Sequence, residues 1–179
     1  MQRLSWLIGL IGIVVGLAGI YVTALQSADA LNALADLLRG AAVPSQYKSL
    51  AGGIQFFGVG LIIAVSYAFF GVGLTATGRP ILAVLGAKRP TLSSFFFVLS
   101  LSSVAAALAL AGYTSTAAAI AIAFGIWFFS LSAFACTIPS TKQDDGEDAA
   151  FLLVAFLIPA LVAGVYVAFR FLAGLVAHV

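Results

Sequence analysis

Residues Ser102–Gly125 read SSVAAALALAGYTSTAAAIAIAFG, and this stretch decides how the apolar middle of the chain folds. It lies inside an apolar block, Thr91–Cys136, that is too long for one membrane crossing, since about 20 helical residues cover a hydrocarbon core of about 30 Å. The turn-forming string GYTST at Gly112–Thr116 divides the block. The sequence therefore predicts two spans, Thr91–Gly112 and Thr116–Cys136, and their small side chains predict a very close hairpin.

Three further apolar segments complete the set of predicted spans. The chain has 179 residues, of which 63% are hydrophobic and 8% are charged, whereas a soluble domain carries about 25% charged residues. So few charges cannot cover a water-facing surface, and long continuous apolar runs do not fit a β-barrel. We therefore expect an all-α, polytopic integral membrane helix bundle with about five transmembrane helices, in which residues 1–179 form a single transmembrane domain. The three further spans are Leu4–Leu25, Ile54–Thr77 and Ala149–Val176.

Lysine and arginine residues in the flanking segments predict the orientation, because they accumulate on the cytoplasmic side of short loops. With the N-terminus inside and the C-terminus outside, three basic residues lie outside and five lie inside, the five being Arg3, Arg79, Lys88, Arg89 and Lys142. Between the first two spans, residues 27–39 are predicted to form a short amphipathic outer helix. We expect a multi-pass protein of the cell membrane, which in a prokaryote is the plasma membrane.

Small residues recur at helical spacing in three of the predicted spans. In lipid such residues let two helix backbones approach closely, so we interpret the stripes as packing faces, either within the chain or toward a second chain. We expect the stripe of the first span to face that of the second, and Gly12→Leu or Gly16→Leu to cost about 1–3 kcal/mol through overpacking. The predicted packing residues are Gly9, Gly12, Gly16 and Gly19 in the first span, Gly53, Gly60, Ala64 and Gly71 in the second, and Gly164 in the fifth.

Polar groups inside the spans provide two candidates for function. Ser93, Ser100 and Ser103 follow one another along the third span and form a candidate polar path, although most such hydroxyls bond to their own helix or to a neighbour. Arg170 is the one charge within the fifth span. Its position about two-thirds along an over-long run favours snorkelling to the outer headgroups, and contact with an ion or an anionic ligand is the alternative.

Aromatic and acidic clusters each allow a structural and a functional interpretation. Phe95–Phe97 and Trp127–Phe129 fall at one depth, where an aromatic belt accounts for them and a groove for a hydrophobic ligand or a quinone is the alternative. The acidic run Asp144–Asp148 lacks the spacing of a calcium-binding loop. We interpret it as a solvated loop whose last acid favours the positive end of the fifth span.

Recognisable catalytic chemistry is absent from the sequence. The chain has one Cys and one His, no Asp, Glu, Lys or His lies within a predicted span, and no zinc-binding or nucleotide-binding motif occurs. We therefore predict no catalytic residue, no cofactor and no metal, and an enzyme is not the favoured class.

The leading hypothesis is a non-enzymatic assembly or packing subunit of a larger membrane complex or a homo-oligomer. Its expected partners are membrane lipids and other membrane subunits, without nucleic acid. The alternatives are a small channel or permease for an uncharged or hydrophobic solute, and a lipid- or quinone-binding membrane protein.

Overall fold

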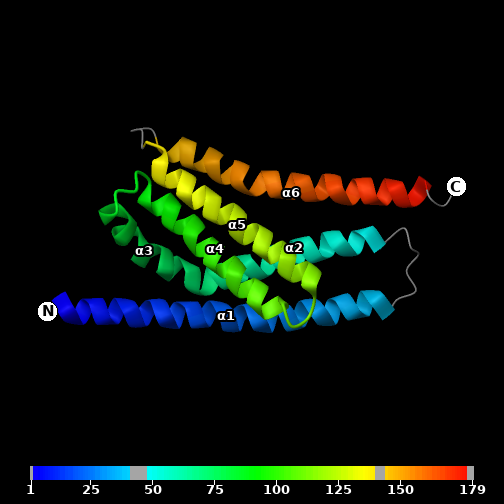
Figure 1. Cartoon of the computed structure of the whole chain (residues 1–179), viewed down its shortest axis with the longest axis horizontal. Coiled ribbons are helices and arrows are strands. Elements are labelled where there is room, and N and C mark those ends of the chain that lie inside the picture. Colours follow the sequence, from blue (N-terminus) through cyan, green and yellow to red (C-terminus); the bar gives the residue numbers. More distant parts are fainter. Residues whose placement is uncertain (1, 41–47, 140–143, 177–179) are drawn as a thin grey trace.

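The chain is built from helices that run back and forth along one long axis (Figure 1). The computed structural model describes residues 2–40, 48–139 and 144–176, and it describes side-chain surroundings for 11–34, 36, 52–139 and 148–176. Every regular element within these residues is a helix. The elements are α1 (Gln2–Gly40), α2 (Lys48–Ser66), the π-helical turn η2 (Tyr67–Gly71), α3 (Val72–Val84), α4 (Pro90–Leu110), α5 (Ser115–Thr137) and α6 (Asp144–Val176).

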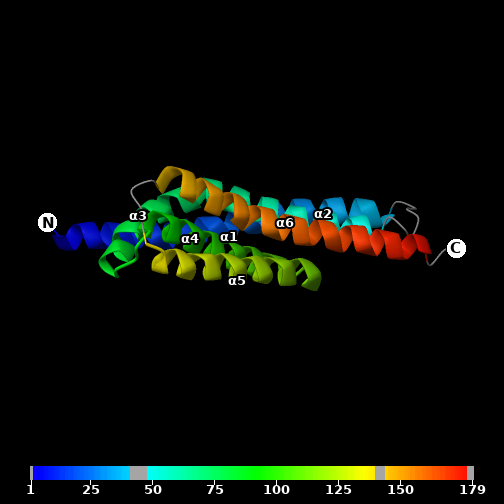
Figure 2. The ribbon, with the colours of Figure 1, turned by 90° about the horizontal axis from the view of Figure 1, so that it is seen from above.

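Five helices in the described ranges are long and apolar enough to cross a membrane, so the prediction of an all-α chain with five such helices is confirmed, and the fold is consistent with a helical membrane bundle. The lengths of these helices differ widely. α4 has 21 residues and α5 has 23, which corresponds to about 32 and 35 Å, close to one crossing. α1 has 39 residues and α6 has 33, or about 58 and 50 Å. In both views α1, α2 and α6 extend beyond the turn that joins α4 to α5 (Figures 1 and 2).

The hairpin of α4 and α5 is the centre of the fold, in agreement with its small residues. Ser100 Oγ donates to Gly125 O at 2.9 Å, and Ser93 Oγ donates to Ser132 O at 3.1 Å. Ser132 Oγ returns a hydrogen bond to Ser93 O at 2.9 Å. Since a side-chain hydroxyl reaches the backbone of the facing helix only at close range, the two helices are in near backbone contact. α4 is also the most buried of the five candidate spans. In each span we consider an apolar window of 18 residues, and in α4 67% of this window is buried.

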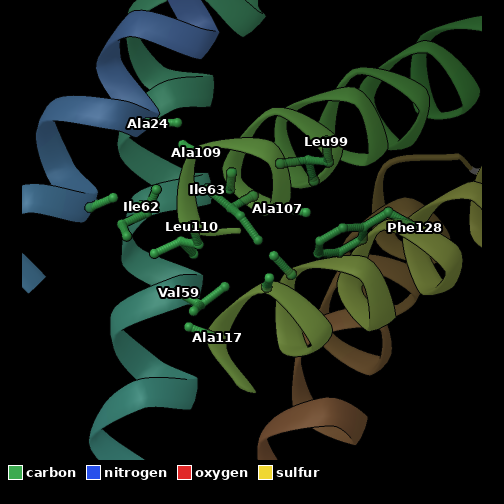
Figure 3. Close-up of a cluster of buried hydrophobic side chains, with 14 of the residues drawn as sticks. Ala24, Val59, Ile62, Ile63, Leu99, Ala107, Ala109, Leu110, Ala117 and Phe128 are labelled. Atoms are coloured by element: carbon green, nitrogen blue, oxygen red, sulfur yellow. The ribbon is translucent and has the colours of Figure 1, made fainter. Parts of the chain in front are cut away.

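The apolar core is built around this hairpin and draws on five helices, part of it being drawn in Figure 3. Ala24 of α1 and Ile62 of α2 pack with Leu110 of α4 and Ala117 of α5, and Ala155 of α6 belongs to the same cluster. Phe96 of α4 is fully buried. A core of small and branched side chains of this kind is compatible with closely spaced helix backbones.

Aromatic side chains attach α6 to the bundle near the beginning of that helix. The Phe151 ring lies 5.6 Å from that of Phe96, and the Phe156 ring lies 5.7 Å from that of Phe128. Trp127 Nε1 of α5 donates to a backbone carbonyl of α6 at 2.9 Å. Rings of this size hold the backbones apart, and only 11% of the apolar window of α6 is buried. Along α4 and α5, α6 is therefore joined to the bundle by side chains, whereas its closer backbone approach is to α2, where the Cβ position of Gly53 lies 3.3 Å from Val167.

Gly16 and Gly19 of α1 face large side chains and not a stripe of small residues, so the expectation of two facing stripes is wrong at these two positions. A Cβ atom at Gly16 would lie 3.0–3.2 Å from the side chain of Leu74, and one at Gly19 would overlap the ring of Phe70. Both large side chains come from the η2–α3 segment. Large side chains of one helix thus fit onto glycines of the other.

A π-helical turn explains why the small-residue stripe of the second span is broken. The wide turn η2 adds one residue to the helical repeat, so the residues after it are rotated by roughly 100° relative to a regular helix. The ring of Tyr67 lies over Gly71, where a Cβ would overlap it. Thr75 Oγ1 donates to Gly71 O at 2.8 Å, so the Tyr67 hydroxyl donates to Thr75 Oγ1, also at 2.8 Å. Small residues before the turn no longer share a face with Gly71.

The other predicted packing positions have varied surroundings. Gly53 of α2 is buried, and its Cβ position lies 3.3 Å from Val167 of α6. Ala64 is exposed, and the surroundings of Gly9 lie outside the described residues. An added Cβ would meet nothing within 4 Å at three of the predicted positions, which are Gly12, Gly60 and Gly164.

Two helices are longer than the sequence predicts. Residues 27–39 do not form a separate outer helix but continue α1 to Gly40. Ala28 is fully buried and Leu31 packs on Gly58 of α2, so contacts with neighbouring helices favour continuation over a break. The second span likewise continues beyond its predicted end, as α3 runs past Pro80 to Val84, because a proline removes only one backbone hydrogen bond from a helix.

A leucine at Gly19 should destabilise the fold, because it would displace the Phe70 ring from α1. We expect Gly19→Leu to cost about 1–3 kcal/mol, seen as a lower melting temperature in mild detergent. Gly73→Leu is the matched control, since Gly73 is exposed with nothing within 4 Å of its Cβ position. The same open surroundings remove the cost expected for Gly12→Leu. Equal melting temperatures for the Gly19 and Gly73 variants would contradict the packing of α1 on η2.

Candidate functional site

An apolar groove lies between α1, α2 and α6, on the side of the α4–α5 turn. Its volume is about 1140 Å³, which is at the upper end of the range of pockets that hold small molecules. The walls come from Ser27–Leu34 of α1, Gly53–Val65 of α2 and Gly164–Phe171 of α6. Ser27 contributes the one polar side chain among the lining residues. The groove therefore suits an apolar occupant.

Glycines of α2 account for the shape of the groove. Gly58 lies directly under Leu31 of α1, whose side chain would overlap a Cβ there, and Gly53 lies under Val167 of α6. These two contacts bring α2 close to both neighbours. Gly164, in contrast, has nothing within 4 Å of its Cβ position. A space the size of a side chain is therefore left open beside α6.

One hydrogen bond indicates where the groove lies along the bundle. Tyr113, in the turn between α4 and α5, donates its hydroxyl proton to Asp29 Oδ1 of α1. Asp29 raises the pKa of Tyr113, first through this hydrogen bond and then through its negative charge. α1 continues from Asp29 to Gly40, a further 16 Å or so, and the groove residues Ser27 and Leu34 lie on either side of this level. Since α4 and α5 each have the length of one crossing, the groove lies across one edge of the apolar layer.

Arg170 lies at the same end of the bundle. It is exposed and has no ion pair among the described residues. The buried Ala163 and the groove residue Val167 precede it by seven and three residues, so the three residues share one side of α6. On that side Ala163 is buried and Val167 is half-buried, whereas Arg170 is exposed.

The depth of Arg170 follows from counting along the antiparallel helices α5 and α6. Trp127 of α5 is hydrogen-bonded to Ala155 of α6. Twelve residues separate Trp127 from Ser115, where α5 begins, and the same number separates Ala155 from Val167. Arg170 therefore lies about 5 Å beyond the beginning of α5.

The three serines of the predicted polar path are buried between helices. Ser93 and Ser100 donate to carbonyls of α5, as described above, and Ser103 Oγ donates to Leu99 O of its own helix at 2.8 Å. All three side chains are buried. Because their protons are engaged with backbone acceptors, they do not line an open path in the described part of the chain.

A second cavity lies between α6 and the rest of the bundle, with a volume of about 460 Å³. It includes Phe95 and Phe128 from the two aromatic clusters noted in the sequence. The Phe128 ring stacks on that of Phe124 at 5.9 Å and lies 5.7 Å from the ring of Phe156 in α6, so Phe128 supports α6 as well as lining a space. The other aromatic residues in its wall are Phe56, Phe57, Tyr67 and Phe156.

An ion pair joins helices at the opposite end of the bundle. Arg89, the residue before α4, is only 8% exposed. Its Nη1 donates to Asp148 Oδ1 of α6 at 2.6 Å, and its Nη2 donates to Pro139 O at 3.3 Å. Beside it, the backbone N–H of Lys88 donates to Cys136 O at 3.2 Å. These bonds tie the beginnings of α4 and α6 to the end of α5.

Sequence reasoning missed both the ion pair and the groove. Asp148 was expected to favour the positive end of a helix, but its partner Arg89 is 59 residues away in the sequence. No local pattern selects one basic residue of a loop as that partner. The groove depends on three helices that are distant in sequence. No group of three or more His, Cys, Asp or Glu side chains suited to a metal occurs within the described residues.

Removing Asp148 should be more harmful than removing the whole ion pair. Asp148→Leu leaves the guanidinium of Arg89 buried without this carboxylate, and we expect a cost of about 1–3 kcal/mol, reduced because the Asp148 side chain is 41% exposed. Arg89→Met added to it should recover part of the loss. Lys88→Met, which removes a positive charge next to Arg89 in the sequence, is the control for the change in net charge. A double variant that melts below Asp148→Leu would contradict this account.

The sequence matches no protein-family model, and comparisons with curated proteins and with solved structures find no match.

Proposed function

We propose that the chain is a non-enzymatic, multi-pass membrane protein that acts as an assembly subunit, in a larger membrane complex or as a homo-oligomer. One observation carries this proposal, namely that only 11% of the apolar window of α6 is buried. Helices in lipid are held together by close packing and interhelical hydrogen bonds. α6 obtains little of either from its own chain, so a neighbouring chain would supply what is missing.

The uncovered face of α6 is continuous. Five of its aliphatic residues are between 43% and 61% exposed. They recur at intervals of three, four or seven residues and so share one face of the helix. A helix from a second copy or from another membrane subunit can pack along this face, which consists of Val154, Ile158, Leu161, Val165 and Leu172.

The proposal includes an orientation and a location. The N-terminus is cytoplasmic and the C-terminus lies outside, in the plasma membrane of a prokaryote. The basic residues Arg79, Lys88 and Arg89 support this orientation, because basic residues accumulate on the cytoplasmic side. They lie in the last part of α3 and in the segment between α3 and the beginning of α4.

The two alternatives are supported unequally. A permease that used the hydroxyls of α4 loses its support, because those hydroxyls are engaged with backbone carbonyls. Binding of a lipid or another hydrophobic molecule is favoured by the two apolar cavities. Such binding is compatible with an assembly role.

Cysteine cross-linking in native membranes tests the assembly proposal. With the native cysteine removed by Cys136→Ala, we expect Val165→Cys, on the uncovered face of α6, to give an oxidative cross-link to a second chain. Ile126→Cys is the matched control, since Ile126 is 64% exposed but lies on α5. Absence of a cross-link from residues 161, 165 and 172 alike, together with a monomer in native mass spectrometry, would contradict the proposal.

A further inference from the structure

We propose that the groove between α1, α2 and α6 binds one acyl chain of an anionic phospholipid, with the phosphate of the headgroup beside Arg170. This inference does not depend on the assembly role, because a monomer could hold the same lipid. Three features support it, which are the apolar lining of the groove, its length and the position of Arg170.

The groove requires an apolar occupant. Its wall has Ser27 as its one polar side chain, and water is stable in a cavity only where it has two to four polar partners. An empty groove would forfeit dispersion contacts along its whole wall. At the edge of the apolar layer, lipid chains are the material that is always present.

The length of the groove corresponds to one leaflet. Its α2 wall extends from Gly53 to Val65, which is about 18 Å of helix, compared with about 15 Å for half of a hydrocarbon core. Val59 packs beside Ala117 near the beginning of α5 (Figure 3). Val65 therefore lies about 9 Å deeper than Ala117 and about 12 Å deeper than Ser115, where α5 begins, whereas Arg170 lies about 5 Å beyond Ser115 on the other side. A phosphate at Arg170 thus leaves room for one acyl chain to extend to Val65.

Charge selects the headgroup. Arg170 is exposed and lies three residues, about one helical turn, beyond the groove residue Val167. The two carboxylates of α1 near this end are engaged, Asp29 with Tyr113 and Asp36 in an interaction of its own. A guanidinium forms charge-assisted hydrogen bonds with phosphate oxygens. A zwitterionic headgroup has the same phosphate but also carries a cation of its own, whereas an anionic headgroup keeps a net negative charge. An anionic phospholipid is therefore preferred over a zwitterionic one.

A transmembrane helix of a partner fits the groove less well. Such a helix has to cross about 30 Å, roughly twice the length of groove available inside the apolar layer. Its diameter is about 10 Å with side chains, whereas the groove is bounded on three sides by helices of this chain. The uncovered face of α6 borders the groove, because the groove residue Ala168 lies three residues after Val165 and four before Leu172. The rest of that face remains open to a partner.

Native mass spectrometry of the full chain in mild detergent tests the proposal, with phosphatidylglycerol and phosphatidylcholine of identical acyl chains as probes. We expect the wild type to retain one phosphatidylglycerol in preference to phosphatidylcholine. Arg170→Gln should weaken phosphatidylglycerol binding about fivefold, the effect of one basic residue near an anionic surface. It should weaken phosphatidylcholine binding less, so that the preference for phosphatidylglycerol decreases. Gly164→Leu should weaken binding of both lipids, because its side chain enters the groove.

Two matched controls separate these effects from general ones. Arg79→Gln removes an exposed arginine at the other end of the bundle, and Gly73→Leu adds a leucine at an exposed glycine away from the groove; both should bind lipid like the wild type. Undiminished lipid binding by Gly164→Leu would overturn the proposal, and so would an unchanged preference in Arg170→Gln. A stoichiometric protein chain that Gly164→Leu releases, with no lipid bound to the wild type, would assign the groove to a partner instead. Loss of cross-linking through α6 with lipid binding intact would remove the assembly role alone.

Discussion

The hydrogen bonds from serine hydroxyls of α4 to backbone carbonyls of α5 are the interaction on which the other contacts depend. Ser93 and Ser132 exchange bonds in both directions, and Ser100 reaches Gly125 O. In lipid no water competes for these groups, and the close approach that they require is possible only where side chains are small. Another serine of α4, Ser94, donates to Thr75 O of α3 at 2.9 Å. α4 is thus bonded to helices on two sides, which explains why it is the most buried span.

A second kind of contact attaches α6. Phenylalanine rings and one tryptophan join it to α4 and α5, and the Arg89–Asp148 pair holds its beginning. Rings fill a wider space than glycine or alanine, so the helix lies farther from its neighbours than α5 lies from α4. Farther along, Val167 rests on Gly53 while Gly164 leaves space open. The cavities beside α6 follow from this change from small to bulky contact residues.

The sequence predicts the helices better than it predicts their contacts. The five apolar segments and the turn at Gly112–Thr116 can be located because length and composition are local properties. The close hairpin follows from the small residues in both of its helices. The facing glycine stripes were not found, because a glycine face accepts a large side chain such as Phe70 as readily as another glycine. The π-helical turn η2 also rotates the second half of the second span relative to the first half, and no local sequence pattern predicts this turn. The groove is even harder to predict from the sequence, since it is the space between three helices that are distant in the sequence.

The remaining polar groups lie at two levels of the bundle, and their separation bears on the role of Arg170. Arg89 and Asp148 lie at the beginning of α4, and Tyr113 and Asp29 lie just past its end. The 21 residues of α4 place these levels about 32 Å apart, close to the thickness of one hydrocarbon core. Arg170, about 5 Å past the beginning of α5, belongs to the second level. We propose that it is a charge at the membrane surface rather than a charge within the membrane, and that its partner is to be sought among headgroups and not among ions in transit.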